Sequence, residues 1–322
     1  MGLYSRDRPM WELTAAACQK DDTTLIDQAL SKASQHDDIN DLELLNEFCA
    51  LAVQHNSANV LTHLIKQGAS IKSLKPGNIT WRGPRTKPIM EILLAHGWDI
   101  NARDTSRGYL GAEPFMWSVV TDIDLVTWCL EHGASVYPRD QEPLRDDILT
   151  MSQRKCQQIL EKAAYSATVA TFELLRSKGA PLGWRPLHRA IETTTHYQAY
   201  PGEEANRREE EEKEAKESAR KYEERMAMVR HLVDVVGIDV NAPDEPPGAG
   251  VPDRWGTPIC YIAKSYGLET DTRELAWFLL DRGADPTPAL EIAKSTEHQK
   301  FVADVEAWRA QQADGRKCCA IQ

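Results

Sequence analysis

Residues 274–288 read ELAWFLLDRGADPTP, a short apolar stretch followed by a charged pair, Gly-Ala-Asp and two prolines. The same order of residue types recurs at 61–73 (LTHLIKQGASIKS), 90–102 (MEILLAHGWDINA), 127–139 (TWCLEHGASVYPR), 173–183 (ELLRSKGAPLG) and 231–243 (HLVDVVGIDVNAP). A phrase that returns at intervals of a few tens of residues is typical of an array of similar structural units. The repeated phrase therefore predicts that the fold is built from one structural unit used several times.

Each phrase predicts a helix that ends at a glycine. Apolar residues recur at i, i+3 and i+4, as at Leu275, Phe278 and Leu279, which is the spacing of a helix buried along one side. Glycine closes many helices because it adopts the left-handed conformation without strain. The expected helix ends are Gly68, Gly97, Gly133, Gly179, Gly237 and Gly283.

A second signal recurs before some of the capping glycines, about 20 to 25 residues ahead where the unit carries no insertion, within the repeat lengths known for such arrays. The signal is a proline that directly follows a polar or charged residue, as in Glu113-Pro114, Arg185-Pro186 and Thr257-Pro258. Proline favours the first position of a helix, where its missing N–H costs nothing. Each unit is thus expected to hold two helices and a turn, with the longer spacings reflecting insertions.

The residues at these positions resemble the ankyrin-repeat family. The resemblance rests on Pro-Leu-His-x-Ala at 186–190, Gly-Thr-Pro-Ile at 256–259 and Leu-Leu-x-x-Gly-Ala-Asp at 279–285. It implies an all-α ankyrin-repeat solenoid of about seven or eight helix-turn-helix units, in which His188 is a structural residue. The chain departs from the pattern at Trp98, where alanine usually follows the glycine, and at Ala33, where a glycine is expected.

The resemblance covers roughly residues 10–310 and suggests three regions. These are an N-terminal tail at 1–10, the solenoid at 11–312 and a flexible tail at 313–322. The segment at 79–102 lacks a clear first helix, so the exact number of repeats stays open. The expected units are 10–40, 43–77, 78–107, 111–142, 156–183, 184–245, 254–288 and a closing helix pair at 289–312.

A charged segment at about 194–225 interrupts the sixth unit. Acidic and basic residues alternate four positions apart, as at Glu212 with Lys216 and Glu217 with Lys221, which supports an exposed helix. We expect this helix to lengthen the second helix of its unit outward into solvent. A solvated spacer is the favoured interpretation, since charge runs are usually solvated, and a partner-binding arm is the alternative.

Composition argues against several classes of function. A net charge of -11 and a pI of about 5.4 disfavour a nucleic-acid surface. Seven scattered cysteines without a Cys-x-x-Cys pair fit a reducing compartment and no zinc site. No apolar run is long enough for a transmembrane helix. We expect a cytoplasmic protein that has no nucleic-acid partner.

Enzyme motifs are missing from the sequence. It contains neither a phosphate-binding glycine loop nor a nucleophile elbow, and its histidines fall in different units without a metal-binding pattern. We therefore predict no enzymatic activity, no cofactor, no metal and no small-molecule substrate. The alternative is an enzyme with an unrecognised site in an insertion such as 194–225 or 242–255.

The predicted partner-binding surface lies at the turns that join the units. Trp81 and Trp255 precede first helices and Trp98 follows a capping glycine, so each ring either covers the adjacent turn or is an exposed anchor for a partner. Polar residues on the same turns add hydrogen-bonding groups. The predicted contact residues, for a protein partner that the sequence does not identify, are Trp81, Trp98, Arg103, Tyr137, Arg139 and Trp255.

The last four residues, Cys319-Ala320-Ile321-Gln322, match the signal for prenylation of a cysteine, with the final glutamine favouring a farnesyl group. One lipid chain binds a membrane weakly, so a second signal is expected, and Cys318 is a candidate for palmitoylation. The sequence thus predicts a protein-binding adaptor held at the cytosolic face of a membrane through Cys319. The alternative is the same adaptor without lipid.

Overall fold

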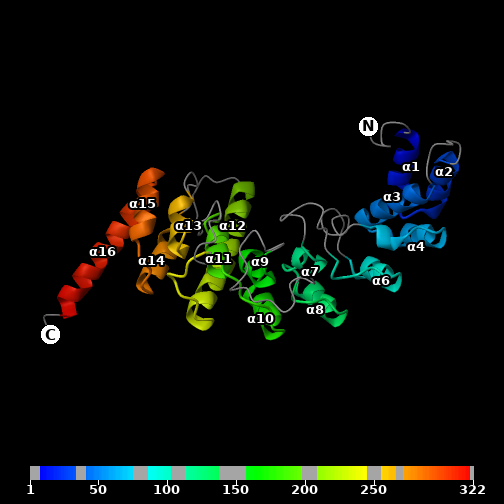
Figure 1. The fold of residues 1–322 in the computed structure, drawn as a ribbon. Helices are drawn as coiled ribbons and strands as arrows, with labels where there is room; N and C mark the ends of the chain where they lie inside the picture. Colours follow the sequence, from blue (N-terminus) through cyan, green and yellow to red (C-terminus); the bar gives the residue numbers. More distant parts are fainter. Residues whose placement is uncertain are drawn as a thin grey trace. The chain divides into compact units, whose positions relative to one another are not determined.

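The structure, a computed structural model, describes residues 8–33, 41–74, 86–102, 113–137, 157–197, 209–244, 255–265 and 271–319. Every regular element in these segments is a helix (Figure 1), which confirms the all-α class. None of the helices described is both long and apolar enough to cross a membrane. The chain divides into two compact units, residues Met1–Asp140 (unit 1) and Gln141–Gln322 (unit 2).

Unit 1 consists of helices that pair in chain order. Helix α1 packs on α2, α3 on α4, and α7 on α8, while α1 also contacts α3, and α4 contacts both α2 and α6. The first two hairpins and α6 therefore share one row of contacts. The elements are α1 (Arg8–Lys20), α2 (Thr23–Ala33), α3 (Asp41–Gln54), α4 (Ala58–Lys66), the 3₁₀ turn η2 (Ile71–Ser73), α6 (Lys87–Ala95), α7 (Phe115–Ser118) and α8 (Ile123–Glu131).

Unit 2 repeats this arrangement. The first helices α9, α11, α13 and α15 contact one another in chain order, and each packs on the helix that follows it. The elements are α9 (Ile159–Ser166), α10 (Val169–Ser177), α11 (Pro186–Thr194), α12 (Glu209–Arg230), the π-helical turn η6 (His231–Val235), α13 (Pro258–Lys264), α14 (Arg273–Asp281), α15 (Thr287–Ser295) and α16 (Gln299–Cys319).

The glycines predicted to end helices do so. All six have a positive φ, between 80° at Gly237 and 105° at Gly68. At five of them the residue after the glycine donates its N–H to a carbonyl five residues back, as from Ala284 to Leu279. This is the hydrogen bond of a Schellman C-cap, in which the left-handed residue turns the chain back over the helix.

Two asparagines fasten a turn to the next hairpin in the same way. The Asn101 side chain donates to the Gly133 carbonyl at 3.0 Å and accepts from the Ser135 N–H at 2.8 Å. The Asn241 side chain donates to the Gly283 carbonyl at 2.9 Å and accepts from the Asp285 N–H at 2.8 Å. The first clamp lies in unit 1 and the second in unit 2, so one joint is built twice from the same residue type.

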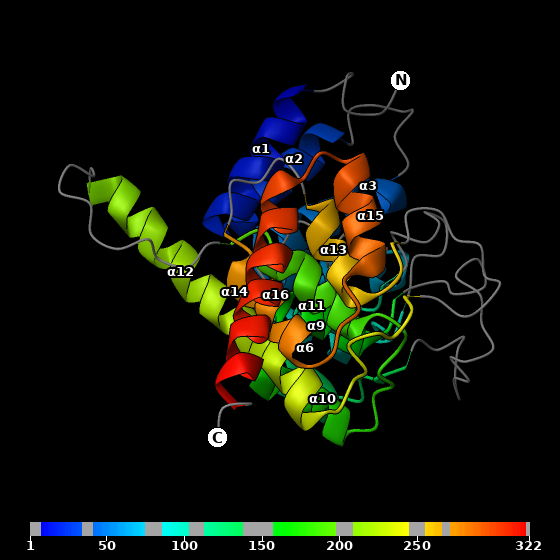
Figure 2. The same ribbon diagram turned by 90° about the vertical axis from the view of Figure 1, so that its left-hand side faces the viewer.

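Helix α12 carries the charged segment. Its early turns hold the predicted ion pairs, with Lys216 2.5 Å from Glu212 and Lys221 3.6 Å from Glu217. Figure 2 shows this part of the helix projecting away from α11 and α14. From Tyr222, which is 1% exposed, the helix turns one face to the core of unit 2. The solvated part therefore ends at Lys221, four residues before the expected limit of about 225.

Helix α16 continues beyond the predicted end of the helical array at 312. It reaches Cys319, so most of the segment expected to form a flexible tail, 313–322, is helical. The residues from Gln311 to Asp314 include good helix formers and no proline, and a single glycine costs a helix only about 1 kcal/mol.

Candidate functional site

Of the predicted contact residues, the structure describes Trp98, Tyr137 and Trp255. Trp81, Arg103 and Arg139 lie outside the described residues, and Tyr137 is half-buried near the end of unit 1. Cys318 and Cys319 belong to the last turn of α16, but their side chains also lie outside what the structure describes.

Trp98 is buried, so of the two alternatives for its ring the structure shows the one in which it packs against the protein. Its side chain is 8% exposed and stands edge-on to Phe115, with ring centroids 5.5 Å apart. The position explains the burial, because the positive φ of the capping glycine directs the next residue inward. Ala180 and Ala284, which also follow capping glycines, are 7% and 5% exposed.

Trp255 lines a groove between α11 and α13 in unit 2. The hollow has a volume of about 290 Å³. Residues at both ends of α11 form one wall. Residues of α13, together with Trp255 just before that helix, form the other. Six of the side chains that line this α11–α13 groove are Arg185, Glu192, Thr195, Trp255, Tyr261 and Lys264.

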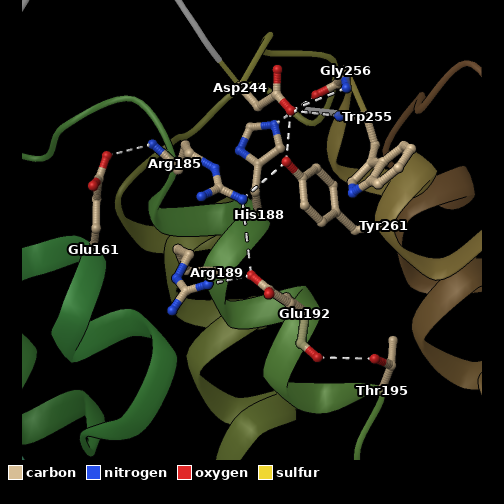
Figure 3. Close-up of polar contacts among 10 residues, drawn as sticks. All are labelled: Glu161, Arg185, His188, Arg189, Glu192, Thr195, Asp244, Trp255, Gly256 and Tyr261. Atoms are coloured by element: carbon tan, nitrogen blue, oxygen red, sulfur yellow. Dashed lines mark hydrogen bonds and ion pairs between the residues drawn. The ribbon is translucent and has the colours of Figure 1, made fainter. Parts of the chain in front are cut away.

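A buried carboxylate fixes one end of the groove. Asp244 is 2% exposed, and its Oδ2 accepts hydrogen bonds from the backbone N–H groups of Trp255 at 2.9 Å and Gly256 at 3.1 Å. The same oxygen accepts the Tyr261 hydroxyl at 2.6 Å (Figure 3). Burial raises the pKa of Tyr261 to about 12, so its hydroxyl keeps the proton that it donates. One aspartate thereby positions both aromatic residues of the groove.

His188 holds the backbone at Ala242 and the backbone at Gly256 together. Its Nε2 lies 3.2 Å from the Ala242 carbonyl and 3.1 Å from the Gly256 carbonyl, so it is the protonated nitrogen and donates to both. The side chain is 1% exposed, and its ring stands edge-on to Tyr261. The role expected from the resemblance, a structural histidine, matches these contacts.

Arg185 extends from the N-terminal end of α11 into the groove. Its Nη2 donates to the Tyr261 hydroxyl at 3.0 Å, and the guanidinium lies 5.4 Å from the centre of the Tyr261 ring. The backbone N–H groups of Trp184 and Arg185 both donate to Oε1 of Glu161 at 2.9 Å. Glu161 is 4% exposed and therefore acts as a buried cap that fixes where α11 begins.

The other charges of the groove are arranged around α11 and the end of α13. Glu192 pairs with Arg189 at 2.5 Å and lies 3.9 Å from Arg185. On α13, the ammonium of Lys264 sits 4.2 Å from the centre of the Trp255 ring, within the range of a cation–π interaction. Two aromatic rings and two cations thus border one hollow.

Sequence reasoning found Trp255 but missed Arg185, Glu192, Tyr261 and Lys264. Arg185 and Tyr261 are 76 residues apart in the chain, so no local pattern joins them. A usable signal existed in the repeat itself, because Arg185 and Trp255 occupy the segments just before two first helices that the array predicts to be neighbours.

Among the described residues, no group of three or more histidine, cysteine or acidic side chains is placed to hold a metal ion. No protein-family model matches the chain, and no curated protein matches it.

Proposed function

We propose that this protein is an ankyrin-type repeat array that binds another protein and has no catalytic role. The supporting observation is the pair of asparagine clamps. Asn101 in unit 1 and Asn241 in unit 2 make equivalent hydrogen bonds to the next hairpin. When hairpins stack and are joined in this way, the side chains at the helix ends and turns can differ from one hairpin to the next. Recognition is then a property of that variable surface.

A binding function also agrees with the character of the α11–α13 groove. Aromatic and arginine side chains are enriched where proteins bind one another, and this groove contains Arg185, Trp255 and Tyr261. Hydrogen bonds fix the positions of Arg185 and Tyr261 before any ligand arrives. Such preorganisation reduces the entropy that binding costs.

The proposal is tested by affinity capture from cells with the full-length protein as bait. The matched control is Leu279→Asp, which places a charge at a fully buried position of α14 and should disrupt unit 2. A direct partner is expected on the wild-type bait only, and the purified pair should form a complex in calorimetry. Equal capture by both baits, or no complex between the purified proteins, would contradict the proposal.

The second part of the proposal is lipid attachment at Cys319, supported by the sequence of the last four residues. Since α16 reaches Cys319, its final turn must open for an enzyme to modify the thiol, and helix ends open readily. Full-length protein expressed in eukaryotic cells should gain the mass of one farnesyl group, and Cys319→Ser should lose both that mass and membrane fractionation. An unmodified wild-type C-terminal peptide would favour the soluble adaptor.

A further inference from the structure

The α11–α13 groove has an excess of positive charge in an acidic protein. Arg185 and Lys264 line it, and Glu192, the acidic residue among the described ones that line it, is already paired with Arg189 at 2.5 Å. The carboxylate of Asp244 lies behind the groove at 2% exposure, with one oxygen held by three donors. The chain as a whole carries a net charge of -11. A ligand for this hollow should therefore be anionic.

Arg185 has donors to spare for such a ligand. A guanidinium has five N–H donors arranged as a planar fork, and the Tyr261 hydroxyl takes one of them. The Arg185 side chain is only 13% exposed, and the bond to Tyr261 holds it in place. A carboxylate is the acceptor whose two oxygens match this fork.

The aromatic wall points to more than a bare anion. The half-buried Trp255 is fixed through its backbone bond to Asp244 and carries the Lys264 ammonium on its ring. The four-carbon stem of lysine allows the ammonium to move from the ring to an arriving carboxylate. The ring is then uncovered for an apolar side chain. A volume of about 290 Å³ suits a few side chains, because small-ligand pockets begin near about 300 Å³.

We propose that the α11–α13 groove binds an acidic linear segment of the partner protein, with an Asp or Glu carboxylate on Arg185 and Lys264 and an adjacent apolar side chain on Trp255. This assignment rests on the proposed protein-binding function and names the chemistry that the partner presents. The area is small, so the segment supplies specificity at one point of a larger contact or binds weakly by itself.

The neighbouring repeat offers a matched control. Residues 258–264 (PICYIAK) and 288–294 (PALEIAK) share the proline and the final Ile-Ala-Lys. Lys294 is therefore the counterpart of Lys264 in α15, and it is exposed. The position equivalent to Trp255 is Asp285, so the second lysine has no aromatic partner at that position. Lys294→Glu makes the same change of charge outside the groove.

The test selects peptides from a displayed library of random heptapeptides on the full-length protein. Enriched peptides are expected to contain Asp or Glu next to Leu, Phe or Tyr. Lys264→Glu should weaken binding of a selected synthetic peptide at least 10-fold, whereas Lys294→Glu should change it less than 2-fold. Arg185→Lys keeps the charge but loses the fork, so it should weaken binding about 5-fold, within the range of one charge-assisted hydrogen bond. Circular dichroism checks that each variant is folded.

A second arm replaces the acidic residue of the selected peptide by its amide. Wild-type binding should fall to the level of Lys264→Glu, and that variant should bind both peptides alike. Enrichment of sequences without acidic residues, no enrichment, or equal effects of Lys264→Glu and Lys294→Glu would overturn the assignment. Displacement by millimolar inorganic phosphate would also overturn it, because the groove would then bind small anions. If a captured partner binds Lys264→Glu as tightly as wild type, the groove assignment fails while the protein-binding function stands.

Discussion

Replacing Gly183 by alanine should lower the free energy of unfolding of unit 2 by about 4 kcal/mol, of which about 1.5 is the cost of a left-handed alanine. Gly183 has a φ of +73°, and a Cβ built on it would lie 2.5 Å from Oε1 of Glu161 and 2.9 Å from its Cγ. That carboxylate caps α11 through two backbone N–H groups. Displacing it would leave both donors without their charged acceptor, which costs the remaining 2 to 3 kcal/mol.

Gly179→Ala separates the two contributions. Gly179 has a φ of +86°, but an added Cβ meets no atom within 4 Å, so only the backbone cost of about 1.5 kcal/mol is expected. Hydrogen exchange of the α9 and α11 amides reports the local free energy for both variants. In a Glu161→Ala background, Gly183→Ala should also cost only about 1.5 kcal/mol. Equal effects of the two glycine substitutions in the wild-type background would show that the cap at Glu161 contributes nothing.

The parts of the fold that the sequence predicted are those encoded by local rules. A one-sided apolar stripe followed by glycine needs only a helix and a left-handed cap, and these signals correctly located the ends of α4, α6, α8, α10 and α14. The same rule also accounts for the burial of Trp98. A residue that follows a left-handed cap is directed inward, so its burial follows from the cap that the sequence had already predicted.

The parts that the sequence did not reveal depend on contacts between distant residues. Glu161 caps a helix that begins 25 residues later, and Asp244 collects donors from Trp255, Gly256 and Tyr261. Neither carboxylate belongs to a local capping motif, because the acceptor comes from a different turn or helix. The α11–α13 groove has the same origin, because Arg185 and Lys264 line one hollow only when two first helices pack together.

A decrease in pH should destabilise unit 2 through His188. Burial is the main cause that lowers its pKa from 6.5 to about 4, and the charge of Arg185 acts in the same direction, while the charge of Asp244 opposes it. Below pH 6.5 the unfolded chain binds a proton at this position and the folded chain does not. The free energy of unfolding should therefore fall between pH 6.5 and 4 by about 3 kcal/mol in total, and this contribution should change no further at lower pH.

His188→Gln isolates this contribution, because a glutamine amide has N–H donors for the carbonyls of Ala242 and Gly256 but does not titrate. Acidic groups elsewhere, such as Glu173, whose pKa is lowered mainly by its hydrogen bond to His231, titrate in both proteins and cancel in the difference. Urea unfolding at a series of pH values should show the wild type losing stability relative to His188→Gln as the pH falls from 7 to 4. A difference that stays constant over this range would mean that His188 binds its proton equally well in the folded and unfolded chains.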